Sequence, residues 1–312
     1  MKRTILVLVL ALLFAGLAPT EAAGPLQMAV RPGFAGAAKI GTWVPVEIEL
    51  QNTGPEVTGE IQILVEGQTT RGSWNRPPVT YTVPISLPDR SRKRLSLGMY
   101  FPGADEKIEA QLVADGQPPL RQPVTIERVL ASELFCGIMT GNRNGLDFLT
   151  TLDLNGQQRR VRLAHLDPVD IPAAFPFLQS LDCLVLANVS TGSLTAHQKE
   201  AVRHWVHAGG LLVLGGGAGV QKTLGPLPGE LLPVKVTGSV PVRSLDRLAA
   251  FFGQPLPERG PWLVGDAEVT SGVTVIAQDG LPLLVSAPRG QGAVVYLGLD
   301  PTAEPLRSWE GT

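Results

Sequence analysis

The stretch from Leu181 to Gln221 constrains the fold more than any other part of the chain. Short continuous apolar runs predict buried strands over Leu184–Leu186 and Leu211–Leu214, because such runs are typical of strands covered on both faces. Between them, Thr195 is suited to cap a helix, and Gln198 follows at the spacing of a capping box. A glycine pair then ends the helix. Strand, helix and strand in this order predict a parallel α/β sheet.

The rest of the second half favours the same class. The apolar patterns predict strands over Leu134–Met139 and Arg160–His165, helices over Gly145–Leu154 and Ser244–Phe252, and a closing hairpin of Leu283–Ser286 with Ala293–Leu299. Strands that alternate with helices predict a doubly wound, flavodoxin-like parallel sheet over residues 130–306. We expect the boundary to the preceding domain near Val129–Glu133.

Residues 23–129 have a different period. Apolar and polar residues alternate in runs that are separated by turn residues, as expected for half-buried strands. The clearest runs are Val44–Leu50, Ile61–Val65, Tyr81–Leu87 and Leu95–Phe101. About seven such strands predict an antiparallel β-sandwich of immunoglobulin-like size. A basic cluster at residues 90–94 is interpreted as a charged, solvated strand edge.

The N-terminus has the features of a signal peptide. Lys2-Arg3 precedes an apolar run, and small residues at Thr20 and Ala22 suit cleavage after Ala22. The run is short for a membrane span of about 20 residues. We therefore expect residues 1–22 to be removed and the protein to be exported to the cell envelope or beyond. The net charge of −2 does not indicate a nucleic-acid-binding protein, because such proteins carry an excess of positive charge.

The second half resembles the class I glutamine amidotransferase-like fold. The resemblance rests on Asp182–Leu186, the helix that follows, and Leu212–Gln221. It implies an elbow of the form Gly-x-Cys-x-Gly after the second strand, in which a helix N-terminus activates the cysteine. It also implies a His and a Glu late in the chain. Related degenerate domains accompany β-sandwiches in exported, membrane-anchored bacterial proteins.

This chain departs from that pattern at both places. Gly215 and Gly219 match the flanking glycines of the elbow, but Gly217 stands at the cysteine position. The late segment Leu299–Pro301 contains neither the His nor the Glu. The resemblance therefore implies the fold without the activity, so that no catalytic residue and no cofactor is expected. The tail, residues 307–312, carries no anchor, and the resemblance raises the alternative of a truncated form of a longer membrane-anchored protein.

Three functions stay open at this point. The favoured one is a non-catalytic binding or scaffolding protein whose partner is an unknown envelope protein or a glycan. The second is a hydrolase or amidotransferase with a displaced nucleophile, for which Ser190, Thr191 and Ser193 are the candidates. The third is a carbohydrate- or ligand-binding module that uses a crevice at the carboxyl ends of the strands. That crevice would be formed by Asn188, Ser190, Thr191 and Gly216.

The remaining candidates are weaker. His197, Glu200, His204 and His207 share one face of the predicted helix; we interpret them as a solvated face and expect no metal site, because one helix does not enclose a tetrahedral ion. The polar loop Arg71–Arg76 contains Trp74 and offers a contact for a glycan, or a tryptophan that packs on its own domain. Cys136 and Cys183 are the only cysteines, and the sequence leaves open whether they pair.

Overall fold

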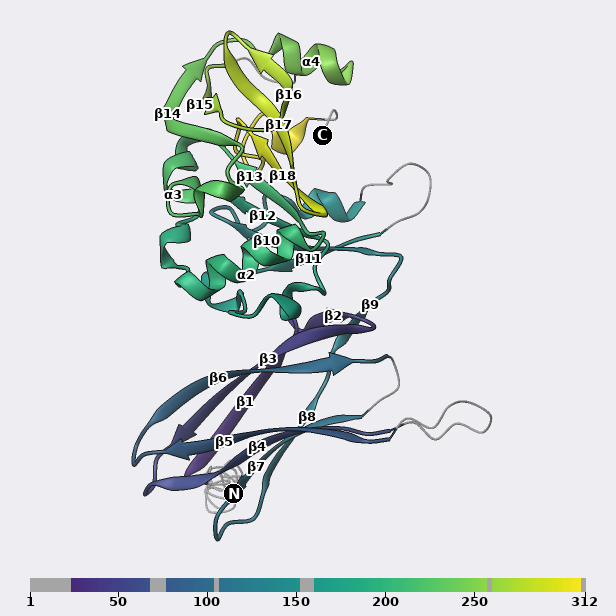
Figure 1. Ribbon diagram of the computed structural model, residues 1–312, viewed down its shortest axis with the longest axis vertical. Helices are drawn as coiled ribbons and strands as arrows, with labels where there is room; N and C mark the ends of the chain where they lie inside the picture. The colour runs from purple at the N-terminus through teal and green to yellow at the C-terminus, as the bar shows by residue number, and fades with distance from the viewer. Residues whose placement is uncertain (1–23, 68–76, 104–106, 152–159, 257–259, 310–312) are drawn as a thin grey trace, which may run out of the picture.

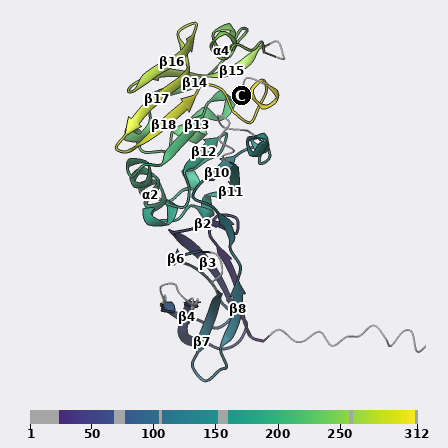
Figure 2. The same ribbon diagram turned by 90° about the vertical axis from the view of Figure 1, so that its right-hand side faces the viewer.

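The computed structural model describes residues 24–67, 77–103, 107–151, 160–256 and 260–309. Antiparallel sheets form one end of an elongated molecule, and a mixed α/β region forms the other (Figures 1 and 2). The predicted signal peptide, the loop 71–76 and the last residues of the tail, 310–312, lie outside the described residues. Across those ranges no helix is both long and apolar enough to cross a membrane.

Two antiparallel sheets build the N-terminal region. One has the order β1-β3-β6 and the other the order β5-β4-β7-β8. Their bounds are Leu26–Pro32 (β1), Thr42–Asn52 (β3), Val57–Val65 (β4), Val79–Leu87 (β5), Arg92–Phe101 (β6), Ile108–Ala114 (β7) and Leu120–Val124 (β8). Val44, Val46 and Ile48 of β3 are fully buried in one core with Ile61 and Ile63 of β4. The period-two pattern therefore predicted both the strands and their inward faces correctly.

The second half contains a seven-stranded mixed sheet with the order β11-β10-β12-β13-β18-β17-β16. The first five strands are parallel, and β17 and β16 add an antiparallel edge. The bounds are Leu134–Thr140 (β10), Val161–His165 (β11), Cys183–Ala187 (β12), Leu211–Gly215 (β13), Val273–Gln278 (β16), Leu281–Arg289 (β17) and Gly292–Leu297 (β18). The chain is thus a β region followed by an α/β region.

Helix α2, Ala196–His207, begins as the sequence predicts. The Thr195 hydroxyl accepts a hydrogen bond from the Gln198 backbone N–H at 3.2 Å, and the Gln198 side chain accepts one from the Thr195 N–H at 2.8 Å. Val202, Trp205 and Val206 are buried against one face of the sheet. The other α-helices of the described ranges are short, namely α3 (Val220–Leu224) and α4 (Asp246–Phe252).

One expectation for the α/β region was wrong, and one of its features was not predicted. The segment predicted as a helix over Gly145–Leu154 forms a 3-10 turn, η1, over Asp147–Thr151, and residues 152–154 lie outside the described ranges. The hydroxyls of Thr150 and Thr151 donate to the carbonyls three residues back, which competes with α-helical hydrogen bonding. The sequence patterns also do not predict a two-stranded ribbon, which β14 (Val234–Val242) and β15 (Trp262–Val269) form.

The two regions meet through a partly buried ion pair. Lys39 is the last residue of β2 (Ala37–Lys39). This strand pairs in parallel with β9 (Glu127–Val129), after which the chain passes into the α/β region. The Lys39 ammonium lies 2.6 and 2.5 Å from the two carboxylate oxygens of Asp182, just before β12. The same carboxylate accepts the backbone N–H of Phe135 at 2.7 Å. Asp182 therefore links β2 to the starts of two central strands.

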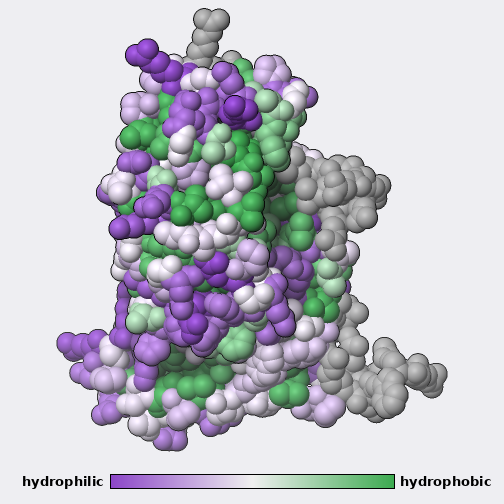
Figure 3. Space-filling model, turned by 45° about the horizontal axis from the view of Figure 1, so that its top comes forward, coloured by the Kyte–Doolittle hydropathy of each residue, from purple (hydrophilic) through white to green (hydrophobic). Residues whose placement is uncertain are grey.

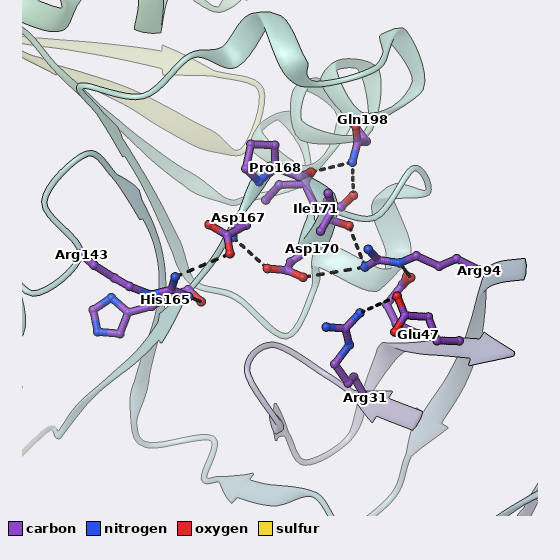
Figure 4. A network of polar contacts seen from close by, with 12 residues as sticks. Arg31, Glu47, Arg94, Arg143, His165, Asp167, Pro168, Asp170, Ile171 and Gln198 are labelled. Carbon is purple, nitrogen blue, oxygen red and sulfur yellow. Dashed lines mark hydrogen bonds and ion pairs between the residues drawn. The ribbon is translucent and has the colours of Figure 1, made fainter. Parts of the chain in front are cut away.

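A second set of contacts lies beside this pair. Arg94 of β6 donates to Glu47 at 2.9 Å and lies 3.9 Å from the Asp170 carboxylate of the α/β region (Figure 4). Gln198 of α2 donates to the Pro168 and Ile171 carbonyls and so holds the turn that carries Asp170 (Figure 4). Arg94, interpreted from sequence as part of a solvated edge, is thus a junction residue.

Packing is equally close where β6 meets the 3-10 turn η3 (Phe175–Leu178). A methyl group on Gly98 would overlap the ring of Phe177, so this position accepts only glycine in the observed arrangement. The Thr42 and Ser180 hydroxyls share a hydrogen bond of 2.5 Å across the same boundary.

We expect Asp182→Ala to lower the free energy of unfolding by about 3 kcal/mol, because it leaves the Lys39 ammonium, whose side chain is 12% exposed, without its partner. The matched control is Glu49→Ala, which removes an exposed ion pair with Arg31 and should change the same quantity by less than about 1 kcal/mol. Urea denaturation measures both. Equal effects of the two substitutions would contradict the role given to Asp182.

Candidate functional site

The predicted elbow follows β13 and is closed by the strand beside it. The Gly216 N–H donates to the carbonyls of Leu297 and Leu299 at 2.7 and 3.0 Å, and the Gly217 N–H donates to Gly298 at 3.1 Å. An oxyanion hole requires such N–H groups to point at the reacting oxygen. Here both are already paired with backbone. Gly217 has a φ of +69°, which glycine adopts without strain.

The flanking glycines allow close packing. A methyl group on Gly219 would overlap Asn188, whose Cα would lie at only 2.7 Å. One on Gly215 would lie 2.8 Å from the Pro301 ring. The hydrogen bonds of Asp300 are local, since its carboxylate accepts both the N–H and the hydroxyl of Thr302 at 2.9 and 2.7 Å. The glycines at this turn therefore allow the segments that follow β12, β13 and β18 to pack closely together.

The hydroxyl candidates lie in the loop after β12. Thr191 is fully buried, and its hydroxyl donates to the Thr223 carbonyl at 2.8 Å, which ties this loop to α3. The Ser193 hydroxyl donates to the carbonyl of Ser190, and Ser190 itself is exposed. Asn188 adopts a φ of +52° at the end of β12. Of the predicted crevice residues, Asn188 thus approaches Gly219 of the elbow, whereas Thr191 takes part in loop packing.

A histidine lies at the carboxyl end of β11. His165 Nε2 is 3.0 Å from the Asp147 carboxylate, while its buried Nδ1 has no hydrogen-bond partner. A His–Asp pair becomes a catalytic base when a nucleophile bonds to the second ring nitrogen. No hydroxyl or thiol among the described residues donates to or accepts from this Nδ1. The pair is therefore incomplete as a triad.

The histidines of α2 lie on its exposed face with Glu200. His204 Nε2 is 3.0 Å from the Glu200 carboxylate, and its ring meets Phe175 edge to face at 5.9 Å. A hydrogen bond from Arg203 lowers the pKa of Glu200. Within the described ranges, no group of three or more His, Cys, Asp or Glu side chains is placed to hold a metal ion.

The face of the mixed sheet opposite α2 carries an apolar groove of about 270 Å³. Its floor comes from the sheet and its rim from η1, α4 and the C-terminal segment. We define the groove by residues Cys136, Leu146, Phe148, Leu149, Cys183, Val185, Val213, Leu248, Phe252, Leu283, Leu284, Leu297, Leu299, Pro301, Leu306 and Trp309. The surface in Figure 3 shows hydrophobic residues gathered along a hollow in this half of the molecule.

The sequence patterns do not predict this groove. Continuous apolar runs predicted that both faces of the central strands are buried. One face is covered by α2, but the other is only partly covered, because α4 has seven residues and η1 is a single turn. At the rim, Phe252 remains 46% exposed, and its ring meets Trp309 at 5.4 Å. A signal was present in the short predicted helices over Gly145–Leu154 and Ser244–Phe252, neither of which is long enough to cover a sheet face.

Comparison with known proteins leaves the function open. Residues 25–127 match the family described as "Domain of unknown function (DUF8726)". A comparison with curated proteins finds no match.

Among solved structures, the chain is similar to the cytoplasmic protein STM3548 from Salmonella typhimurium, at 15% identity and a TM-score of 0.44, over 57% of this chain and 94% of that one. It is also similar to red sea bream transglutaminase, at 17% identity and a TM-score of 0.24, over 33% of this chain and 16% of that one. A third is a β-glucosidase from Listeria innocua, at 11% identity and a TM-score of 0.23, again over 33% and 16%.

The closed elbow predicts a steric penalty. Gly219→Ala should lower the free energy of unfolding by about 1–3 kcal/mol, because its methyl group overlaps Asn188 and the backbone must move. Gly229→Ala is the control, since open space surrounds that position and its effect should stay within about 0.5 kcal/mol. Thermal unfolding of the two variants checks this. A neutral Gly219→Ala would mean that the turn is looser than described.

Proposed function

We propose that this chain is a non-catalytic scaffolding or binding protein of the bacterial cell envelope. In this proposal an immunoglobulin-like β-sandwich precedes a flavodoxin-like domain of the class I glutamine amidotransferase type that has lost its catalytic residues. The parallel strand order β11-β10-β12-β13-β18 supports the second assignment, because it corresponds to the order 2-1-3-4-5 of flavodoxin-like sheets. Export is inferred from the sequence of residues 1–22.

One observation carries the non-catalytic proposal. The N–H groups of Gly216 and Gly217 are bonded to the end of β18 and its continuation, at the place where an active relative would need them for an oxyanion. Gly217 also lacks a side chain that could attack a substrate. Restoring a thiol there would not supply the missing base, because the adjacent Asp300 is bonded to Thr302.

The junction supports a scaffolding role. Partly buried ionic and hydroxyl contacts and the Gly98–Phe177 packing hold the two regions against each other. A fixed junction presents surfaces of both regions in a constant orientation, which suits a protein that positions partners.

A second candidate function is binding at the apolar groove. Its volume lies just below the range of about 300–1,000 Å³ that is typical of small-molecule sites. One or two large apolar side chains from a partner segment fit that volume better than a drug-sized ligand. This candidate replaces the polar crevice at the strand ends as the favoured binding surface, because the groove is apolar and open whereas the elbow is packed.

We expect the full chain to show no glutaminase activity and no labelling by a covalent serine-hydrolase probe. The physical reason is that the described residues place no nucleophile beside an activated base. Gly217→Cys should also remain inactive. Ammonia release is the measurement, with Ser190→Ala, Cys136→Ser and Cys183→Ser as companion variants. Release above background that any of these three substitutions abolishes would refute the non-catalytic proposal.

Groove binding is tested separately with an environment-sensitive apolar dye. We expect Phe252→Ala to weaken dye binding about fivefold, which corresponds to about 1 kcal/mol, because an aromatic ring at the rim is lost. The control is Val273→Ala, since Val273 is an exposed apolar residue outside the groove. Fluorescence titration measures both. If both substitutions weaken binding equally, the dye binds elsewhere and the groove is not the site.

A further inference from the structure

The two cysteines of this chain meet on the floor of the apolar groove. Cys136 of β10 and Cys183 of β12 are direct register partners on neighbouring parallel strands. Side chains at paired positions of parallel strands point to the same face, and both residues line the groove. Both are free thiols, and Cys136 is 8% exposed.

The register brings the thiols close to the geometry of a disulfide. Neighbouring strands lie about 4.7–4.9 Å apart, which is within the range of about 4.4–6.8 Å that disulfides allow between Cα atoms. Parallel side chains keep that spacing at Cβ, where a disulfide prefers about 3.5–4.5 Å. The strands therefore need to approach locally by about 0.2–1.4 Å. A bond formed under such strain is more easily reduced than a relaxed structural disulfide.

The thiols already interact. A hydrogen bond from Cys183 lowers the pKa of Cys136, although burial and Asp182 oppose this shift and Lys39 assists it. The same hydrogen bond, together with burial, raises the pKa of Cys183. Cys136 is therefore the thiol that ionises first, and the thiolate is the attacking species in disulfide exchange.

We propose that Cys136 and Cys183 form a reversible disulfide, with a low-molecular-weight disulfide such as oxidised glutathione as the oxidant. The Cys136 thiolate attacks one sulfur of the oxidant, a mixed disulfide forms, and one glutathione leaves as a thiolate that takes up the proton Cys136 released on ionising. Cys183 then gives up its proton and attacks the Cys136 sulfur. The second glutathione leaves and takes up that proton. Two protein thiols are oxidised by two electrons, and one glutathione disulfide is reduced to two thiols.

This inference goes beyond the proposed function and does not depend on it. The groove supplies access, because both cysteines line it and Cys183 is partly exposed. The site is a modification site and not a catalytic one, since the pair itself is the substrate of the exchange.

The test uses the full chain, incubated with oxidised glutathione and then analysed by intact mass and tryptic mapping. Arg143, Arg160 and Arg162 lie between the two cysteines, so trypsin separates their peptides unless a disulfide joins them. We expect loss of two hydrogen atoms, a linked peptide pair and recovery of both thiols with dithiothreitol. In Cys183→Ala, the exchange should stop at a stable glutathione adduct on Cys136.

The control is the urea-unfolded chain incubated with the same oxidised glutathione, which shows that the reagent oxidises accessible thiols. Two results on the folded wild-type protein would overturn the proposal, and neither depends on how the variants fold. One is glutathione adducts on the separate cysteines with no linked peptide. The other is two thiols that stay reduced while those of the unfolded chain oxidise.

Discussion

The rest of the structure depends on the contacts that the Asp182 carboxylate makes with both regions. It accepts hydrogen bonds from the Lys39 ammonium of one region and the Phe135 N–H of the other, and it immediately precedes β12, an interior strand of the mixed sheet. A charge so placed needs its partner, because a partly buried ion without one loses hydration and gains nothing in return. The position of β2 is thereby fixed against the ends of β10 and β12. The Gly98–Phe177 and Arg94–Asp170 contacts then align the two regions around that point.

The carboxyl-terminal edge of the mixed sheet and its face opposite α2 differ in how closely they are packed. Its carboxyl-terminal edge, where α/β proteins usually bind ligands, is filled at the elbow by glycine packing and backbone hydrogen bonds. Its face opposite α2 is apolar, partly uncovered, and carries the only two thiols of the chain. The proposed binding role therefore rests on the exposed sheet face and not on the elbow.

Local signals in the sequence predicted local structure well. The Thr195–Gln198 capping box and the alternation in β3 depend on neighbours a few residues apart, and both are confirmed. The ion pair of Lys39 with Asp182 spans 143 residues, and no local pattern encodes it. The groove, and the register that places Cys136 beside Cys183, depend on contacts between distant segments, which no local pattern encodes. The β14–β15 ribbon was missed because glycine and proline interrupt its alternation.

The central claim is that the two regions form one structural unit, held at Asp182, and not two domains on a flexible linker. Differential scanning calorimetry of the full chain tests this most directly, because independent domains unfold separately whereas a coupled pair unfolds cooperatively. The account predicts a single transition in which the calorimetric and van't Hoff enthalpies agree. Two resolved transitions, with the calorimetric enthalpy well above the van't Hoff value, would contradict it.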